Sequence, residues 1–467
     1  MSDTDLLLTY YGDDFTGSTD VLESLSLNGV ETVLFLEPPG PEDLDDMEGV
    51  QAVGLAGTSR SMTPSEMDGE LRPKFEALAA FEATICHYKV CSTFDSSPTR
   101  GSIGHAIDLG LEVFDSPFVP VVVSAPSLQP RGRYVLFGNL FATVDGETYR
   151  LDRHPTMSEH PVTPMTEADL RRHLGEQTDR NIRLLDIRSI DQPDGESLET
   201  DLEKLLTAEP EVVVFDGLNH DHQRRVGRLI WERATQADGT MFSASSSGLE
   251  YALANHWQET GVVEKPAQVE PVESVDQLLV MSGSASPVNA DQMTWAFEHG
   301  FEGVRLDTEE LVDPEGASAE RTRAVEAALE LLDADKSPLL YTARGPDDSA
   351  IERTSARLDE LGIDRSEIGR RLGNQQGQIT RKIVETAGLD RLCVAGGDTS
   401  GFVAPHLDVY ALEFVVPVGP GSPLCRARSR TASLDGLEVA LKGGQVQTTN
   451  DESDYFGLVR AGGDPTS

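Results

Sequence analysis

The chain has 467 residues, 38% of them hydrophobic, which predicts a globular protein of about two to four domains. Its 80 Asp and Glu residues outnumber its 38 Lys and Arg residues, so the formal net charge is -42. This balance argues against a nucleic-acid-binding protein, because no basic face is present to neutralise phosphates. We interpret it as halophilic adaptation to a very salty cytoplasm, where counterions screen the repulsion between acids. An acidic nucleotide-sequestering or metal-buffering protein is the alternative.

The cysteines and the apolar runs indicate in which cellular compartment we expect the protein. The four cysteines form no CxxC pair and have no zinc-like spacing, so we expect reduced thiols: Cys86, Cys91, Cys393 and Cys425. No apolar run approaches the roughly 20 residues of a membrane span. The N-terminus also lacks the basic region and apolar core of a signal peptide. We therefore predict a cytoplasmic protein that does not enter a membrane.

Strand-like apolar runs alternate with helix-like stretches along almost the whole chain. In the first half, the expected strands lie within residues 5–11, 31–36, 51–57, 118–125, 211–217 and 240–245. In the second half, they lie within residues 277–284, 337–343, 391–397 and 411–419. Helical patterns fall between them, for example over residues 19–28 and 318–332. This alternation predicts an α/β fold with mainly parallel sheets covered by helices.

Two stretches interrupt the pattern. Residues 259–275 lack apolar periodicity, which predicts a linker between an N-terminal domain (1–258) and a C-terminal domain (276–467). Residues 131–164 are rich in Arg, His and Pro and too long for an ordinary loop, so we expect a lid or a binding insert. His154 and His160 in this insert fit either a metal site or, as we favour, a structural loop or active-site rim.

The first strand ends in two adjacent carboxylates, Asp13 and Asp14, within "YGDDFTGSTD". One acid can cap the helix that follows, because carboxylates suit the positive end of a helix. Capping explains the second acid poorly. We therefore expect a ligand site here, at the carboxyl end of a strand, where open α/β sheets place their ligands.

Polar residues also follow three other predicted strands of the N-terminal half. They are Thr58, Ser59 and Arg60; Lys89, Ser92, Thr93, Asp95, Ser96 and Ser97; and Asp216, Asn219 and Asp221. Lys89 is notable because the chain contains only seven lysines. A salt bridge from Lys89 to Asp95 with a helix cap is the structural alternative. We favour a polar pocket for a hydroxylated anion, with Arg60 and Lys89 on its carboxylate.

Small residues follow two predicted strands of the C-terminal half. The loops are Ser282-Gly-Ser-Ala-Ser286 and Gly396-Gly-Asp-Thr-Ser-Gly401, and a third glycine pair occurs in Lys442-Gly-Gly444. Small residues let backbone N–H groups approach a ligand, and a helix start favours anions, so the two loops suit phosphate. Glycine required for steric reasons alone is the alternative. Neither a P-loop nor a GxGxxG fingerprint is present, so a nucleotide site here is of another type.

The segments "YGDDFTGSTD", "YKVCSTFDSSP", "SGSAS", "VAGGDTSG" and "LKGG" together resemble the four-carbon acid sugar kinase family. The resemblance spans nearly the whole chain, in the family's order and at comparable spacing. It implies two α/β domains, the first binding a sugar acid and the second ATP, with the active site in the cleft between them. The "CSTFDS" form resembles the 3-oxo-tetronate kinase branch. The insert resembles a sub-branch that includes kinases of 3-oxo-isoapionate, a branched sugar acid.

The resemblance also implies roles for individual residues. On the sugar-acid side, the catalytic candidates are Asp13, Asp14, Lys89 and Asp95, and the substrate-binding candidates are Ser59, Arg60, Ser92, Thr93, Ser96 and Asp216. On the nucleotide side, the candidates are Ser284, Ser286, Gly396, Gly397, Asp398, Thr399 and Gly443. Two segments depart from the family pattern, GGDT in place of GGET and "KGGQVQ" in place of KSGNFG. The departure at Asp398 leaves the metal ligands unassigned.

These observations predict an ATP- and Mg²⁺-dependent kinase that phosphorylates a hydroxyl of a small oxo or hydroxy sugar acid in carbohydrate catabolism. Asp14 is the expected residue to orient or deprotonate the attacking hydroxyl. The expected partners are the sugar acid and ATP, and a homodimer is left open. A non-catalytic sugar-acid sensor of the same fold is the alternative, and a dinucleotide-dependent oxidoreductase is disfavoured by the missing fingerprint.

Overall fold

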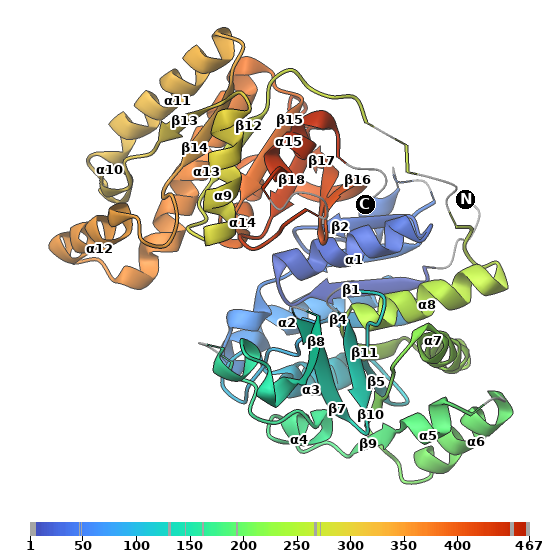
Figure 1. The fold of residues 1–467 in the computed structure, drawn as a ribbon. Coiled ribbons are helices and arrows are strands. Elements are labelled where there is room, and N and C mark those ends of the chain that lie inside the picture. The colour runs from blue at the N-terminus through green and yellow to red at the C-terminus, as the bar shows by residue number, and fades with distance from the viewer. Residues whose placement is uncertain are drawn as a thin grey trace. The chain divides into compact units, whose positions relative to one another are not determined.

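The chain divides into two compact units, Met1–Pro266 and Ala267–Ser467, each containing strands and helices (Figure 1). The computed structural model describes residues 6–45, 47, 49–128, 132–144, 146–160, 163–192, 195–265, 269–270, 272–448 and 453–463. The division falls within the predicted linker, and the last helix of the first unit, α8 (Ser247–Thr260), runs two residues into that stretch.

The main sheet of the first unit is parallel. Its strands, in spatial order, are β11 (Met241–Ser245), β4 (Ile85–Lys89), β1 (Leu8–Gly12), β3 (Ala52–Ala56) and β2 (Thr32–Phe35). All of their residues are buried, as expected for a parallel sheet that helices cover on both faces. Two helix pairs pack on this sheet: α1 (Phe15–Leu27) with α8, and α2 (Pro64–Ala79) with α3 (Ile103–Val113).

Two smaller sheets complete the first unit. The parallel one contains β5 (Val119–Val122), β10 (Val212–Phe215) and β9 (Ile182–Leu185). The helices around it are α4 (Leu170–Gly175), α5 (Ile187–Ile190), α6 (Gly195–Leu206) and α7 (His220–Ala234).

The second small sheet lies in residues 131–164, the stretch in which a lid or a binding insert was expected and no strand was predicted. This stretch contains an antiparallel meander of β6 (Arg133–Leu136), β7 (Asn139–Val144) and β8 (Glu147–Arg150). Two single turns follow, η3 (Leu151–Arg153) and η4 (Met157–Glu159). The strands are short and one face is half-exposed, so their mixed composition does not give the long apolar runs that mark the parallel strands.

The second unit has one mixed sheet. Its strands, in spatial order, are β16 (Val409–Gly419), β17 (Ser422–Ser429), β18 (Glu438–Lys442), β15 (Arg391–Ala395), β12 (Leu279–Ser282), β14 (Ser337–Tyr341) and β13 (Phe301–Arg305). The five strands from β18 to β13 are parallel, whereas β17 runs antiparallel to both of its neighbours. The predicted α/β class with mainly parallel sheets is therefore confirmed.

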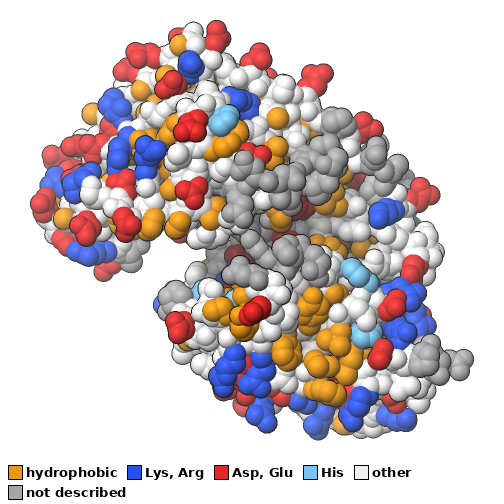
Figure 2. Space-filling view, in the orientation of Figure 1, with side chains coloured by type: hydrophobic (Ala, Val, Ile, Leu, Met, Phe, Trp, Pro, Cys, Tyr) orange, Lys and Arg blue, Asp and Glu red, His pale blue; other side chains and the backbone are white. Residues whose placement is uncertain are grey.

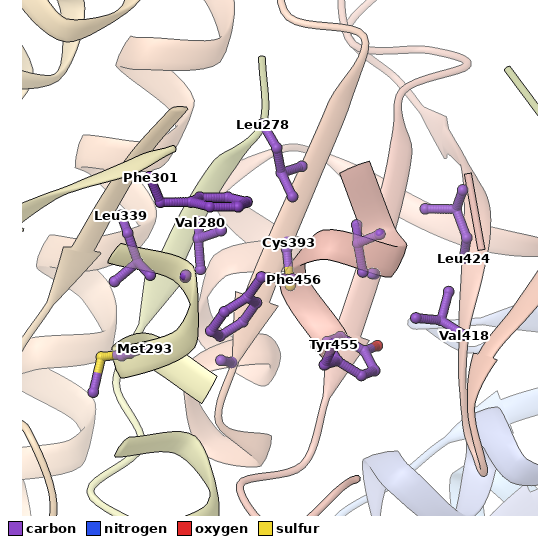
Figure 3. Close-up of a cluster of buried hydrophobic side chains, with 14 of the residues drawn as sticks. Leu278, Val280, Met293, Phe301, Leu339, Cys393, Val418, Leu424, Tyr455 and Phe456 are labelled. Atoms are coloured by element: carbon purple, nitrogen blue, oxygen red, sulfur yellow. The ribbon is translucent and has the colours of Figure 1, made fainter. Parts of the chain in front are cut away.

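Helices surround this sheet, and one core fixes its centre. The helices are α9 (Pro287–Glu298), α10 (Thr308–Val312), α11 (Ala317–Asp333), α12 (Ser349–Leu361), α13 (Ile368–Ala387), α14 (Gly397–His406) and α15 (Tyr455–Ala461). Figure 3 shows Val280 of β12 and Cys393 of β15 packed with Phe301, Tyr455 and Phe456. Because the two central strands are held by this core, the loops that follow them have a rigid base.

Candidate functional site

The carboxyl ends of β1, β3 and β4 lie side by side in the first unit. Gly12, the last residue of β1, is in register with Ala56 of β3 and Lys89 of β4. The backbone N–H of Asp13 donates to the carbonyl of Lys89 at 2.9 Å, and that of Arg60 donates to the carbonyl of Asp13 at 3.0 Å. The topology therefore brings together charged residues that stand far apart in the sequence.

The carboxylates of Asp13 and Asp14 differ in burial and in hydrogen-bond partners. The Asp13 carboxylate is buried and accepts two hydrogen bonds from Arg60, from Nε at 3.1 Å and from Nη2 at 2.7 Å. Burial raises the pKa of Asp13 to about 6, although the Arg60 charge opposes this. Asp14 caps α1 by accepting from the N–H of Gly17 at 2.6 Å, and its other oxygen accepts from Nη1 of Arg60 at 2.5 Å. With 31% of its side chain exposed, Asp14 is the acid that solvent or a substrate can reach.

Lys89 pairs with a residue that the sequence analysis did not single out. Its buried Nζ lies 3.0 Å from Oδ2 of Asp20, on α1, and Ser247 donates to the same oxygen at 2.6 Å. Among the described residues no ion pair joins Lys89 to Asp95, so that structural alternative is wrong. Burial lowers the pKa of Lys89, but the charges of Asp20 and Glu250 outweigh it, and the net pKa lies above the ordinary value. Lys89 is therefore a cation at physiological pH.

Two cations converge on the first turn of α1. A Cβ atom added at Gly17 would lie 2.6 Å from Oδ1 of Asp14, 3.7 Å from Nζ of Lys89 and 3.8 Å from Nη2 of Arg60. Because residue 17 is glycine, the Asp14 carboxylate can lie close to the helix N-terminus beside both cations, and the free N–H groups of the first turn also favour negative charge. This arrangement suits a carboxylate.

The loop after β4 carries further polar groups. Phe94 has a positive φ of 57°, which turns the chain sharply between Thr93 and Asp95. Thr93 is buried with its hydroxyl 2.9 Å from Sγ of Cys91, and Ser92 is half-buried. Oδ1 of Asp95 is buried and has no hydrogen-bond partner among the described residues. An unpartnered buried carboxylate oxygen is costly, so Asp95 is a strong candidate for a ligand contact.

Three predicted substrate-binding residues make hydrogen bonds within the protein. The hydroxyl of buried Ser59 lies 2.9 Å from the phenol of Tyr88. The hydroxyl of buried Ser96 contacts Nε2 of His173 at 2.8 Å, which ties the loop after β4 to α4. Asp216 lies on the second sheet of the unit and accepts backbone N–H groups at 2.7, 2.8 and 2.9 Å, from Phe137, Gly138 and Ile187 respectively. Their polar atoms are thus already engaged.

The histidines of the insert are also structural. Nδ1 of His154 accepts from the N–H groups of Thr156 and Met157 at 3.2 and 3.3 Å, and Nδ1 of His160 accepts from that of Thr163 at 3.1 Å. Across the described part of the chain, no group of three or more His, Cys, Asp or Glu residues is arranged to hold a metal ion. This favours the structural interpretation.

In the second unit, the three glycine-containing loops meet. Ser282 of β12 is in register with Ala395 of β15, which is in register with Lys442 of β18. The N–H of Gly283 donates to the carbonyl of Ala395, and that of Gly396 to the carbonyl of Lys442, both at 2.9 Å. The loops therefore form one edge, at the carboxyl ends of neighbouring parallel strands.

Close contacts explain why this edge is built from small residues. Gly396 has a φ of 128°, and a Cβ atom there would lie 3.3 Å from the N atom of Ser284 and 2.8 Å from Oγ1 of Thr399. Ser286 caps α9 by accepting from the N–H of Asn289 at 3.1 Å, and it donates to the carbonyl of Gly444. By contrast, a Cβ atom at Gly397 would meet nothing within 4 Å. Space is therefore open at the first residue of α14.

A cavity of about 200 Å³ adjoins this edge. Its polar lining comes from Gly283, Thr308, Thr342, Thr354, Gln376, Asp398 and Thr399, and its apolar lining includes Ala285, Ala343, Ala350, Ile351, Ile368 and Leu372. Exposed Asp398 and the hydroxyl of Thr399 supply oxygen atoms beside the glycines. Oxygen donors are what Mg²⁺ prefers, and Mg²⁺ in nucleotide sites is commonly held by one or two carboxylates plus phosphates. These residues fit that ion.

Comparison with known proteins agrees with both units. Residues 8–253 match a family model described as a sugar-binding N-terminal domain, and residues 279–449 match one described as a nucleotide-binding C-terminal domain. The chain is 45% identical to a 3-oxo-isoapionate kinase of Paraburkholderia graminis, over 98% of this chain and 94% of the relative. The chain belongs to the four-carbon acid sugar kinase family.

Other relatives extend the comparison. This kinase is 28% identical to a 3-oxo-tetronate kinase of Pseudomonas savastanoi pv. phaseolicola, over 94% of each chain. Crystal structures of a Haemophilus influenzae protein (TM-score 0.72, 22% identity, 97% and 99% coverage) and a Salmonella typhimurium LT2 protein (TM-score 0.75, 24% identity, 96% and 98% coverage) share its fold. None of its described helices has both the length and the apolar character to cross a membrane.

Lys442, in the third glycine-containing loop of the kinase, was not among the predicted site residues. Lys442 is buried, its Nζ donates to the carbonyl of Gly443 at 3.2 Å, and it lies 5.4 Å above the ring of Tyr455. Burial lowers the pKa of Lys442 to about 8. The signal was present in the sequence, because this is one of only seven lysines and it stands inside the "LKGG" segment.

Proposed function

We propose that this kinase transfers the γ-phosphoryl group of ATP to a hydroxyl of a small oxo or hydroxy sugar acid in carbohydrate catabolism. The first candidate substrate class is a branched acid of the 3-oxo-isoapionate type, since the 45% identical relative carries that name. The 3-oxo-tetronates are the second class, named in the more distant relatives. Both classes combine a carboxylate with several hydroxyls.

One observation carries the proposal on the sugar side. The side chains of Lys89 and Arg60 both lie near Gly17, beside the N-terminus of α1 and the Asp14 carboxylate. A substrate carboxylate bound beside them would meet two cations and helix N–H groups, which are charge-assisted contacts. This is the recognition that separates a sugar acid from a neutral sugar.

The surrounding acids supply the remaining chemistry. Asp14 is the reachable member of the pair, so it would orient the attacking hydroxyl and accept its proton. The unpartnered oxygen of Asp95 would accept another substrate hydroxyl. As the oxygen–phosphorus bond forms, the bond to ADP breaks and ADP leaves with the negative charge. Such transfer depends mainly on positioning and charge neutralisation.

The second unit supports ATP binding. Open space at Gly397 would admit phosphate to the N-terminus of α14, and Asp398 with Thr399 would hold Mg²⁺. The cavity volume of about 200 Å³ is smaller than that of whole-ligand sites, which suits part of a nucleotide. In-line transfer requires both ligands to meet in one place. The expected interdomain active site therefore stays a prediction.

Calorimetry on the full chain tests this division of labour. Arg60→Met should abolish binding of the sugar acid and leave binding of Mg·ATP intact. Gly397→Val should do the reverse, because its side chain would fill the open space at the start of α14. Gly401→Val is the matched control, since Gly401 is also unobstructed but lies one turn farther along α14. Normal ATP affinity in Gly397→Val would contradict the proposed nucleotide site.

A further inference from the structure

Gln376 is a buried residue of the cavity in the second unit, and most of the hydrogen-bonding capacity of its side-chain amide is unused. It lies on α13 with only 2% of its surface exposed, and its side chain lines the cavity. Among the described residues its side chain makes a single hydrogen bond, from Nε2 to Sδ of Met281 at 3.6 Å. Sulfur is a weak acceptor, whereas an amide can donate two hydrogen bonds and accept two.

Two other polar side chains of the cavity, Thr308 and Thr354, are engaged with protein groups. The hydroxyls of Thr308 and Thr354 lie 2.5 Å apart, and Thr354 also donates to the carbonyl of Ala350 at 2.7 Å. A buried polar group normally has partners, and leaving its capacity unused costs stability. Gln376 is therefore poorly explained as a structural residue.

The position of the amide indicates which part of a ligand it would meet. A Cβ atom added at Gly283 would lie 3.1 Å from both Nε2 and Oε1 of Gln376. Gly283 begins the small-residue loop after β12, and it lines the cavity together with Asp398 and Thr399. The apolar lining is contributed by residues such as Ile351, Ile368 and Leu372. The amide of Gln376 therefore lies on the side of the cavity formed by the glycine-rich edge.

We propose that Gln376 is a nucleotide-binding residue that recognises the junction between ribose and phosphate. Its Oε1 accepts a ribose hydroxyl, and its unused N–H donates to a phosphate oxygen. The inference rests on the proposed nucleotide site, and it adds to that site a side chain that discriminates ribonucleotides from deoxynucleotides. A hydrogen-bonding site rejects analogues that lack the matching hydroxyl, because its own buried group is then left unpaired.

Gln376→Met tests this directly, since methionine has nearly the same volume and flexibility. If the amide serves the ligand, calorimetric affinity of the full chain for Mg·ATP falls about 10-fold, the usual effect of one lost hydrogen-bond partner. The melting temperature without nucleotide stays the same or rises, because a poorly satisfied amide has been removed. Gln375→Met is the matched control, since Gln375 bonds to Arg321 and does not line the cavity.

A second ligand series keeps the test decisive if Gln376→Met is less stable than expected. The wild type should bind one of the two analogues, 2′-deoxy-ATP or 3′-deoxy-ATP, about 10-fold more weakly than ATP, because that analogue lacks the hydroxyl that Gln376 recognises. Gln376→Met should bind ATP and the same analogue with equal affinity. Two results would overturn the inference without contradicting the proposed nucleotide site. One is an ATP affinity of Gln376→Met within twofold of the wild type. The other is that the loss of affinity from the substitution and the loss from the missing ribose hydroxyl add independently. Absence of ATP binding in the wild type would overturn both the inference and the nucleotide site.

Discussion

At the scale of single residues, the two adjacent acids divide their roles. Asp13 is enclosed and fixes Arg60 through two hydrogen bonds, whereas Asp14 caps α1 and keeps part of its surface exposed. Sequence alone could predict that a cap does not need both acids. It could not predict which acid would be enclosed, because that depends on the position of Arg60, 46 residues beyond Asp14.

Replacing Asp14 separates catalysis from capping. Asp14→Asn retains an N-cap of similar quality but removes the charge and the proton acceptor. Turnover should therefore fall by about 10²- to 10⁴-fold, while the melting temperature changes little. Steady-state kinetics and thermal melts on the same preparation measure both quantities.

Asp13→Asn is the matched control for that experiment. Its enclosed carboxylate is the bidentate partner of Arg60, so its loss should cost about 3 kcal/mol of unfolding free energy. A stably folded Asp14→Asn enzyme with normal turnover would exclude Asp14 as the base. Asp95 would then be the next candidate.

Lys442 gives a prediction about pH. Its folded-state pKa of about 8 lies below the ordinary lysine value of 10.5, so the folded protein binds fewer protons than the unfolded chain between these two values. Stability contributed by this group therefore rises as pH increases from about 8 to 10, and below pH 8 the buried charge is a cost. Lys442→Met should melt at a higher temperature at pH 7.

Thermal melts of the wild type and Lys442→Met at pH 7, 8, 9 and 10 check this prediction. The difference between the two proteins should shrink as pH rises, because the wild-type lysine loses its charge in the folded state. A difference that is constant over this range would show that the lysine does not titrate there.

At the scale of elements, strands with long apolar runs were predictable, whereas the strands of the insert and the parallel strands β4, β9, β13 and β18 were not among those expected. Each apolar run named from the sequence contains a strand, for example Val212–Phe215 within 211–217 and Arg391–Ala395 within 391–397. Such runs are typical of strands buried on both faces. Strands with alternating or polar residues, such as β6 to β8 and β13, lack that signal and depend on their neighbours in the fold.

The same contrast applies to the candidate site. Candidate residues at the ends of apolar runs could be named from the sequence, because the strand itself identifies its end. Asp20 and Gln376 were not named, because each lies inside a helix and only the packed structure shows it facing a charged partner or a cavity. Asp216 also follows a strand, but its carboxylate accepts backbone N–H groups, so its place in the substrate site stays a prediction.

Asp216 therefore supports a prediction about the insert. Its carboxylate holds the turn between β6 and β7 and the start of α5 through three backbone N–H groups. Asp216→Asn replaces one acceptor oxygen with a donor, so at least one buried N–H loses its partner, at a cost of about 1–3 kcal/mol. Denaturant unfolding should show this loss, and the KM for the sugar acid should stay near the wild-type value at low temperature. A large rise in KM without a loss of stability would return Asp216 to the substrate site.

At the scale of the whole molecule, we expect the charge of the surface to have the largest effect on stability. Figure 2 shows acidic and basic side chains scattered over the helices α10 to α12, where Arg353 pairs with Glu309 and Arg357 with Asp313, each at 2.6 Å. Surface pairs of this kind contribute little to stability, because water and salt screen both charges. They cannot offset the repulsion expected from a net charge of -42.

The melting temperature should therefore rise from dilute buffer to multimolar KCl. Salt shortens the screening length from about 10 Å at 0.1 M to about 3 Å at 1 M, which weakens repulsion over the whole surface. An uncharged osmolyte at equal osmolality serves as the control for preferential exclusion. A melting temperature that salt does not raise beyond the osmolyte would remove the halophilic interpretation.

The proposed phosphoryl transfer is tested most directly by ³¹P NMR on the full chain in molar KCl, with Mg·ATP and 3-oxo-isoapionate or a 3-oxo-tetronate. We expect a new phosphate-ester resonance to appear in step with ADP, only when the sugar acid is present, and far more slowly with Asp14→Asn. ATP that stays intact, or that yields inorganic phosphate without an ester for every sugar acid tried, would contradict the account.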